Sequence, residues 1–287
     1  MSAPRPLEPV PSTPDPRTDQ LLRLIRIVER LRAPDGCPWD REQTVESLAP
    51  TLIEEAHEFV EAIESGNSRA CEEEAGDVLL VVALLCQVAQ EDQRFDLESA
   101  ARGVGDKLIR RHPHVFGDVV VDDAAHAIAN WEQIKQAERA ARKGDDASAL
   151  AGVPLAMGAV QRAQRLGAKA MATGFKWADA RGAMAKLREE LDELEEAFEN
   201  AGCAADGRAP LPGPERDRVE AELGDVLLAA AQLANYVEAD AEAVVRAAAR
   251  RFEARFRAME NELAGDLRGR SLDELMAAWG RAKIATA

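Results

Sequence analysis

Two nearly identical heptapeptides, EAGDVLL at 74–80 and ELGDVLL at 222–228, set the strongest limit on how this chain can fold. In each, a glutamate and an aspartate three residues apart run directly into an apolar stretch. Residues three and four apart share one face of a helix, so each phrase predicts a helix with an acidic face next to an apolar one. We expect VLL to anchor that helix in a bundle. An EExxE segment lies upstream of both copies, at 54–58 and 189–193.

Other segments repeat in the same order. GCPWD in the first half corresponds to GFKWAD in the second, DKLIRRH corresponds to RRFEARF, and WEQIK corresponds to WGRAK. The offset between matching positions varies only from 135 residues (Glu55 to Glu190) to 148 residues (Glu74 to Glu222). Such ordered self-similarity indicates an internal duplication. We predict a Pro-rich tail at 1–17, a helical domain at 18–143, a linker at 144–154 and a second helical domain at 155–287.

The composition favours helices. Aromatic residues make up 4% of the chain, alanine is abundant, and no segment shows the period-two alternation of a half-buried strand. The expected fold class is all-α, with tandem duplicated helical bundles. The third predicted helix is apolar nearly all round from Val78 to Val88, so it should lie at the centre of its bundle. In the first half, periodicity broken by Pro and Gly predicts helices over 21–32, 47–65, 68–91, 96–111 and 127–143.

Charge and apolar content exclude several classes of function. The net charge of −16 would repel a duplex, which argues against stable nucleic-acid binding. No apolar stretch reaches the length of a membrane span, and residues 1–17 lack the apolar core of a signal peptide. The four cysteines show no CxxC spacing, and Cys86 lies in an apolar helix, as a reduced core thiol would. We therefore expect a cytoplasmic protein with neither membrane nor nucleic acid as a partner.

Each half contains four carboxylates that two packed helices would bring together. Such carboxylates resist ionising together, so a positive ion should lie among them. Oxygen ligands without His or Cys favour Mg²⁺, with Mn²⁺ as the alternative, and Mg²⁺ commonly bridges to substrate phosphates. The competing interpretation is an ordinary solvated helix face. The candidate ligands are Glu190, Glu193, Glu222 and Asp225 in the second half, and Glu55, Glu58, Glu74 and Asp77 in the first.

The paired EExxE and ExxD segments, together with GCPWDREQT, RRHPHVF and WEQIK, resemble the MazG family of nucleoside triphosphate pyrophosphohydrolases, over about residues 20–285. The resemblance implies an all-α enzyme that uses Mg²⁺ to split a nucleoside triphosphate into monophosphate and pyrophosphate. It also implies a homodimer with broad base tolerance. By the same resemblance the second-half carboxylates are the metal ligands. The phosphate-side residues would be Lys186, Arg218, Arg251, Arg255 and Lys283, with Trp279 beside the nucleotide.

The halves differ in the cations that would hold a triphosphate. Thr51 and Ala70 occupy the first-half positions of Lys186 and Arg218. Because a triphosphate needs Lys or Arg donors beyond the metal, we predict that the second half carries most turnover. The first-half residues that do match are Lys107, Arg111, Trp131 and Lys135. This chain also departs from the family pattern: Ala249 replaces a common asparagine, and Arg251 stands where a lysine is usual.

The expected reaction is in-line attack of water on a phosphorus of the α–β linkage, with the metal lowering the pKa of the water. Glu189 is the predicted general base, with Glu196 as the alternative and Glu54 as the first-half counterpart of Glu189. Two interpretations without turnover stay open. One is a protein that senses a metal or nucleotide or binds a partner, and the other is a purely structural bundle.

Several aromatic residues have two interpretations. His112 and His114 bracket a proline outside a regular helix, so we expect structural or phosphate-adjacent roles rather than metal binding. Trp39 and Trp177 lie at loop-to-helix junctions, where either an aromatic plug or a base-stacking surface fits. The tryptophans of WEQIK and WGRAK each precede a lysine by four residues. That spacing suits a base-stacking ring beside a phosphate contact, and equally a core tryptophan shielded by a lysine stem.

Overall fold

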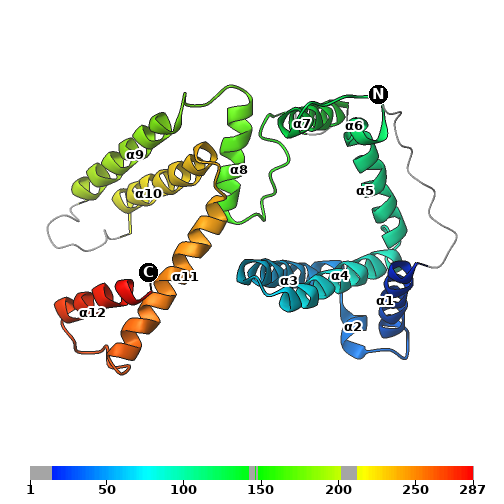
Figure 1. Ribbon diagram of the computed structural model, residues 1–287, viewed down its shortest axis with the longest axis horizontal. Helices are drawn as coiled ribbons and strands as arrows, with labels where there is room; N and C mark the ends of the chain where they lie inside the picture. Colours follow the sequence, from blue (N-terminus) through cyan, green and yellow to red (C-terminus); the bar gives the residue numbers. More distant parts are fainter. Residues whose placement is uncertain (1–14, 142–145, 147, 202–211, 287) are drawn as a thin grey trace. The chain divides into compact units, whose positions relative to one another are not determined.

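The computed structural model describes residues 15–141, 146, 148–201 and 212–286, which form α-helices and one short 3₁₀ turn (Figure 1). These ranges contain no β-strand, which confirms the all-α prediction. None of the described helices is both long and apolar enough to cross a membrane. Cys203 and most of the predicted tail lie outside the described residues. The chain divides into two compact units between residues 143 and 144.

The first unit contains helices over every segment predicted there, although α1 begins at Pro16, inside the predicted tail. Asp15 caps α1, and Pro16 at the first helical position has the φ that a helix requires. The first-unit helices are α1 (Pro16–Arg32), α2 (Pro38–Glu42), α3 (Val45–Ser65), α4 (Ser68–Glu91), α5 (Leu97–Arg111), α6 (Pro113–Phe116) and α7 (Ala124–Ala141). Those of the second unit are α8 (Ala159–Ala172), α9 (Ala180–Asn200), α10 (Pro214–Leu233), the 3₁₀ turn η1 (Ala234–Tyr236), α11 (Ala241–Glu262) and α12 (Leu272–Ala285).

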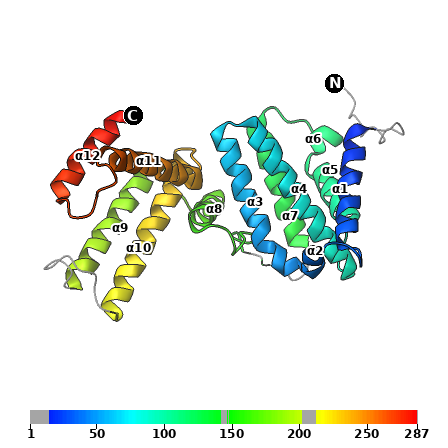
Figure 2. The ribbon, with the colours of Figure 1, turned by 90° about the horizontal axis from the view of Figure 1, so that it is seen from below.

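In each unit two neighbouring helices carry the acidic segments side by side: α3 with α4, and α9 with α10 (Figure 1, Figure 2). Thr44 caps α3 through a capping box with Ser47, and the Asn67 side chain caps α4. Gly66 ends α3 with a φ of 71°, a left-handed conformation that glycine adopts at little cost. Gly66 and Asn67 alone therefore join α3 to α4, whereas residues 201–213 separate α9 from α10.

The core of the first unit lies between α1, α3 and α4. Val28 and Leu48 are each 1% exposed and pack against α4 residues that include Leu84 and Val88. Fully burying such a side chain contributes about 1.5–3 kcal/mol, so these contacts fix α4 as the central helix. Its central position agrees with the prediction from its apolar run. Cys86 on the same helix is a buried free thiol, also as expected, and burial raises its pKa.

The second unit packs around smaller residues in two separate clusters. One is built on Ala231, Ala234 and Ala241 and joins α8 to α10 and to the start of α11. The other surrounds Met259 and joins α11 to α12. The acidic pair and the α11–α12 pair thus have different apolar cores.

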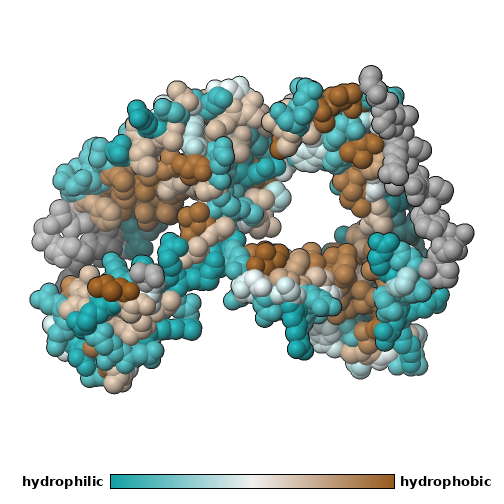
Figure 3. All heavy atoms as spheres, viewed as in Figure 1, coloured by the Kyte–Doolittle hydropathy of each residue, from teal (hydrophilic) through white to brown (hydrophobic). Residues whose placement is uncertain are grey.

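The expectation that VLL anchors both acidic helices is wrong for the middle residue of both copies and for the last residue of the second, Leu228. Leu79 is 50% exposed and Leu227 is 60% exposed. Three consecutive helical residues span most of one turn, so they cannot all face the same neighbours. Leu223 and Leu228 on α10 are exposed as well. Figure 3 shows apolar surface over the α9–α10 pair, so α10 presents an apolar face in the single chain.

Candidate metal centres

Three carboxylates of the second unit lie close enough to share one ion. Glu190, Glu222 and Asp225 each offer an oxygen, and these oxygens lie within 4.8 Å of one another. Glu190 comes from α9 and is only 8% exposed, while Glu222 and Asp225 lie three residues apart on α10. The ELGDVLL phrase thus supplies two of these carboxylates and the EExxE segment supplies the third. We call this trio the second cluster.

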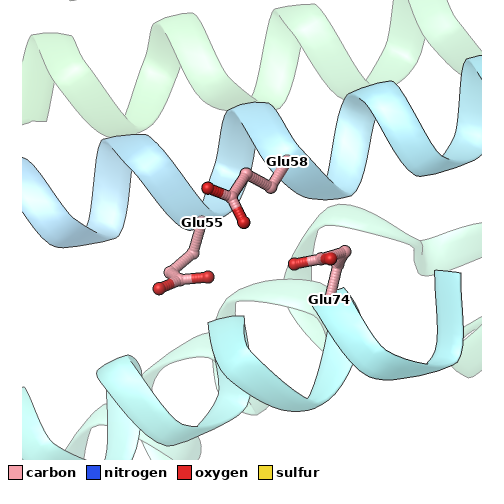
Figure 4. Close-up of side chains that lie close together, drawn as sticks. All are labelled: Glu55, Glu58 and Glu74. Carbon is pink, nitrogen blue, oxygen red and sulfur yellow. The ribbon is translucent and has the colours of Figure 1, made fainter. Parts of the chain in front are cut away.

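The first unit also holds a carboxylate trio, the first cluster, made of Glu55, Glu58 and Glu74. One oxygen from each again lies within 4.8 Å of the other two. Figure 4 shows the three side chains in the space between α3 and α4, two from α3 and one from α4. The duplicated sequence phrases therefore build a carboxylate trio in each unit, but the members differ: the first includes Glu58, the counterpart of Glu193, in place of Asp77, the counterpart of Asp225.

The fourth predicted carboxylate of each half lies outside its trio but acts on it electrostatically. Burial raises the pKa of Glu55, and the charge of Asp77 raises it further. In the second unit, burial raises the pKa of Glu193, and the charges of Glu190 and Glu222 add to the rise. Each half thus brings its four predicted carboxylates into electrostatic range, with three of them in position to share an ion.

Two cations accompany the second cluster from its own helices. The Lys186 ammonium lies 2.7 Å from Glu189 and 2.9 Å from Glu190. Hydrogen bonds to these carboxylates raise the pKa of Lys186, so it stays protonated. Arg218 lies 3.9 Å from Glu222. Each cation reaches an acidic residue four positions along its own helix, the spacing that makes side chains neighbours.

The first cluster has a different electrical environment. Besides burial, the groups that raise the pKa of Glu55 and Glu74 are all carboxylates. Thr51 and Ala70 occupy the places of the two second-unit cations, and neither carries a charge. The negative charge of the first cluster is therefore not offset by cations at the positions that Lys186 and Arg218 occupy in the second unit.

Both clusters suit a hard divalent cation. Burial and neighbouring carboxylates raise the pKa of Glu55, Glu74 and Glu193, and a bound ion would relieve that repulsion. Each trio is made wholly of oxygen donors, the ligands that Mg²⁺ takes at about 2.0–2.1 Å. Neither trio contains the His or Cys donors that would favour zinc.

The two histidines of RRHPHVF stand apart from the acidic groups. His112 ends α5, and its Nδ1 lies 2.7 Å from the carbonyl oxygen of Leu108. The His114 ring lies 5.6 Å from that of His112. Neither belongs to a carboxylate trio.

The remaining predicted site residues lie on α11 and α12, which pack on each other. Arg251 is exposed, and the buried Nε of Arg255 has no hydrogen-bond partner among the described residues. The Trp279 ring lies 5.3 Å from that of Phe252, and the Lys283 ammonium lies 6.0 Å from the Trp279 ring. Since α9 packs chiefly on α10, the predicted site residues form two groups in one chain, one around the second cluster and one on α11–α12.

A pocket of about 290 Å³ lies beside Lys186 in the second unit. Trp177, already noted in the sequence, lines it together with Tyr236, which sequence reasoning missed. The backbone N–H of Trp177 donates to the Tyr236 hydroxyl at 2.8 Å. Tyr236 is the only tyrosine in the sequence, but no local pattern connects it to a segment 59 residues away.

Comparison with known proteins identifies the family. The family model for the MazG nucleotide pyrophosphohydrolase domain matches residues 43–116 and 180–260, one segment in each unit. A Thermotoga maritima protein named nucleoside triphosphate pyrophosphohydrolase/pyrophosphatase MazG is 38% identical over 252 residues, which cover 88% of this chain and 89% of that one. The Escherichia coli K12 nucleoside triphosphate pyrophosphohydrolase is 35% identical over 269 residues, 92% of this chain and 97% of its own. This chain therefore belongs to the MazG family, with two MazG domains in tandem.

Proposed function

We propose that this chain is a Mg²⁺-dependent nucleoside triphosphate pyrophosphohydrolase, which converts NTPs and dNTPs of several bases into monophosphate and pyrophosphate. The observation that carries the proposal is the second cluster, with carboxylate oxygens within 4.8 Å and the Lys186 ammonium 2.9 Å from Glu190. The names of the two relatives support the reaction type. The proposed biological role is clearing unwanted nucleotides from the cytoplasmic pool.

The second-unit carboxylates Glu190, Glu193, Glu222 and Asp225 would hold the metal. When bound, Mg²⁺ supplies charge neutralisation on the phosphates and lowers the pKa of water at the site. Lys186 and Arg218 lie beside acidic side chains from this group, so both could donate to phosphate oxygens at its rim. Two donors with different geometry suit a polyphosphate, because a guanidinium binds in a fork and an ammonium as a point charge.

Glu189 is the proposed general base. Its carboxylate is exposed and lies 2.7 Å from the Lys186 ammonium. A phosphate that draws Lys186 away would leave this carboxylate free to accept the proton of the attacking water. Glu196 is the alternative base, and its carboxylate lies 3.7 Å from Arg218.

We propose that the second unit carries most turnover and that the first binds metal with little triphosphate. The first cluster supports this division, because its neighbours are carboxylates and it lacks counterparts of Lys186 and Arg218. The same observation favours the second candidate function for this unit alone, a metal-sensing or partner-binding role without catalysis.

A homodimer is the proposed assembly. The exposed leucines of α10 (Leu223, Leu227 and Leu228) form an apolar face that a second copy could cover. Leu227→Glu should then shift the chain towards the monomer in multi-angle light scattering. An unchanged mass for this variant would place the contact elsewhere or remove the dimer.

The first experiment is product analysis with a panel of NTPs and dNTPs, in Mg²⁺ or in EDTA. We expect monophosphate and pyrophosphate in equal amounts, no product in EDTA, and comparable rates for several bases. Diphosphate with free phosphate would contradict cleavage at the α–β linkage. Absence of product from every nucleotide would favour the non-catalytic alternative.

A further inference from the structure

Three cations of the first unit gather where α7 packs against α5. Arg110 and Arg111 are the last two residues of α5, and Lys135 lies on α7. The guanidinium carbon of Arg111 lies 5.5 Å from the centroid of the Trp131 ring, and the Lys135 ammonium lies 4.4 Å from it. Cations at such distances are attracted to the face of an indole ring. We call Arg110, Arg111, Lys135 and Trp131 the α5–α7 cation group.

A carboxylate from α7 already binds the two arginines of this group. One oxygen of Glu138 accepts from Arg110 Nε at 2.6 Å, and the other accepts from Arg111 Nε at 3.0 Å and Nη2 at 2.7 Å. The Arg111 and Glu138 side chains are only 15% and 16% exposed, so dissolved salt screens their attraction weakly. Hydrogen bonds from Arg111 and Arg110 lower the pKa of Glu138 to about 2, so this carboxylate stays ionised. Donors that would bind an outside anion are therefore bound within the chain.

The Glu138 carboxylate lies where a phosphate group would bind the same arginines. A guanidinium presents a fork of N–H donors that matches the oxygens of a carboxylate and of a phosphate alike. Because Glu138 belongs to the same chain, it competes with a free anion at the high effective concentration of an intramolecular partner. Lys135 is likewise paired, with Glu132 at 3.5 Å. All three cations thus face carboxylates of their own unit.

The second unit has neither of these carboxylates. The repeat aligns WEQIKQAE at 131–138 with WGRAKIAT at 279–286, which keeps the tryptophan and the lysine. The residues that replace Glu132 and Glu138 are Gly280 and Thr286. The Thr286 hydroxyl donates to a backbone carbonyl of α12 at 2.9 Å. The duplicated segment therefore carries its acidic side chains in the first unit only.

The arginine of α11 differs from its first-unit counterpart accordingly. Arg255 aligns with Arg111, and its buried Nε has no hydrogen-bond partner among the described residues. We propose that Glu138 is a specificity-determining residue, which takes the place of a phosphate on Arg110 and Arg111 and so keeps the first unit from binding a triphosphate. This inference rests on the proposed function. It gives the division between the units a second cause, separate from the cations missing beside the first cluster.

The test counts triphosphate sites by calorimetry, with Mg²⁺ and α,β-methylene ATP, which resists cleavage at the α–β linkage. Glu138→Thr gives the first unit the residue of the second and should add a further triphosphate site per chain. Adding Arg111→Ala should remove the gained site, because that site depends on the released guanidinium. The matched control is Glu98→Thr, which breaks an exposed α5 ion pair with Arg102 and should leave the number of sites unchanged.

The reciprocal substitution leaves α5 and α7 intact. Thr286→Glu places a carboxylate at an exposed position of α12, where it would compete for Arg255 and Lys283. It should raise the KM for triphosphate by on the order of tenfold, whereas Thr286→Gln, of similar size and uncharged, should stay within about twofold of wild type.

Three results would overturn the proposal. The first is a Glu138→Thr protein that is folded by circular dichroism and binds no additional triphosphate. The second is a gain that Glu98→Thr shares or that survives Arg111→Ala, because the released arginines would then not be its cause. If Glu138→Thr does not fold, the third result decides, an unchanged KM in Thr286→Glu. The proposed function fails separately, if wild-type protein yields no pyrophosphate from any triphosphate, since the number of sites is measured without turnover.

Discussion

The two acidic clusters share a backbone arrangement and differ in what surrounds their charge. Both place three carboxylate oxygens within 4.8 Å across a pair of packed helices. In the second, Lys186 and Arg218 lie beside Glu190 and Glu222, and in the first those positions are Thr51 and Ala70. Helix spacing alone therefore maintains a carboxylate trio, whereas a phosphate site also needs cations at specific positions. A duplicated domain can lose the second property while it keeps the first.

The corresponding arginines of α5 and α11 show the same contrast. Arg111 donates to Glu138 at 2.7 Å, and Arg110 reaches the other oxygen of the same carboxylate at 2.6 Å. These hydrogen bonds lower the pKa of Glu138 to about 2. Arg255, at the matching position of the second unit, has a buried Nε without a hydrogen-bond partner among the described residues. The first unit uses Arg111 to join α5 to α7, whereas the Nε of Arg255 makes no comparable contact among the described residues.

The largest effect should come from removing one ligand of each cluster in turn. Glu190→Gln should lower kcat by about 100-fold or more, because metal binding supplies several kcal/mol of charge stabilisation. Glu55→Gln should leave kcat within about twofold if, as proposed, the first unit contributes little turnover. Pyrophosphate release at saturating triphosphate measures both, with Asp192→Asn, an exposed α9 residue outside the trio, as the control. The opposite result would place catalysis in the first unit.

The next effect concerns the cation that distinguishes the clusters. Lys186→Ala should raise KM about tenfold or more, because charge-assisted hydrogen bonds contribute about 1.5–3 kcal/mol. The reciprocal change, Thr51→Lys in a Glu190→Gln background, should increase binding of a non-hydrolysable triphosphate measured by calorimetry. If the KM of Lys186→Ala equals that of the wild type, Lys186 does not bind the triphosphate and does not distinguish the two clusters.

Both clusters should contribute to stabilisation by Mg²⁺. A single site at ten times its Kd adds about 1.4 kcal/mol to the free energy of unfolding. Thermal melting with Mg²⁺ or EDTA should show a rise in Tm for wild type and a smaller rise for either Glu55→Gln or Glu190→Gln. Mg²⁺ that stabilises neither wild type nor variants would support the structural interpretation of the carboxylates.

The smallest effect concerns the ion pair of Glu138. Glu138→Gln should lower the free energy of unfolding by about 1 kcal/mol at pH 7, since one of its two arginines is half exposed. The folded pKa, about 2, is below the usual 4.5, so the stabilisation is present at neutral pH and is lost as pH falls from about 4.5 to about 2. Urea unfolding of both proteins at pH 7 and pH 3 measures this. If the difference in free energy of unfolding between the two proteins grows as the pH falls, the ion pair of Glu138 does not stabilise the fold as predicted.

The fold and the carboxylate trios follow from local rules. Residues three and four apart share a helix face, which places the carboxylates of EExxE together on one helix and those of ExxD together on the next. Lys186 likewise lies four residues before Glu190, and its ammonium lies 2.9 Å from that carboxylate. These features are encoded within one helix or one pair of neighbours, where sequence pattern is most informative.

Contacts between residues far apart in the sequence do not follow from the local sequence pattern. Trp177 and Tyr236 meet across 59 residues, and no periodicity marks that approach. The exposure of Leu227 also depends on which neighbours cover α10, and an apolar residue in a helical pattern does not say whether a neighbour is present. The sequence identified candidate contacts of the nucleotide without showing that they divide between α9–α10 and α11–α12.

The different connections between the acidic helices have a consequence for how each unit folds. Two residues join α3 to α4, and thirteen, 201–213, lie between α9 and α10. Loop-closure entropy grows with the logarithm of length, so bringing the second pair together costs about 1.7 kcal/mol more by the simple chain estimate. We therefore expect α3 and α4 to meet early, as a local hairpin, while the second pair depends more on α8 and its alanine cluster. Catalysis would then reside in the unit whose acidic helices are harder to assemble.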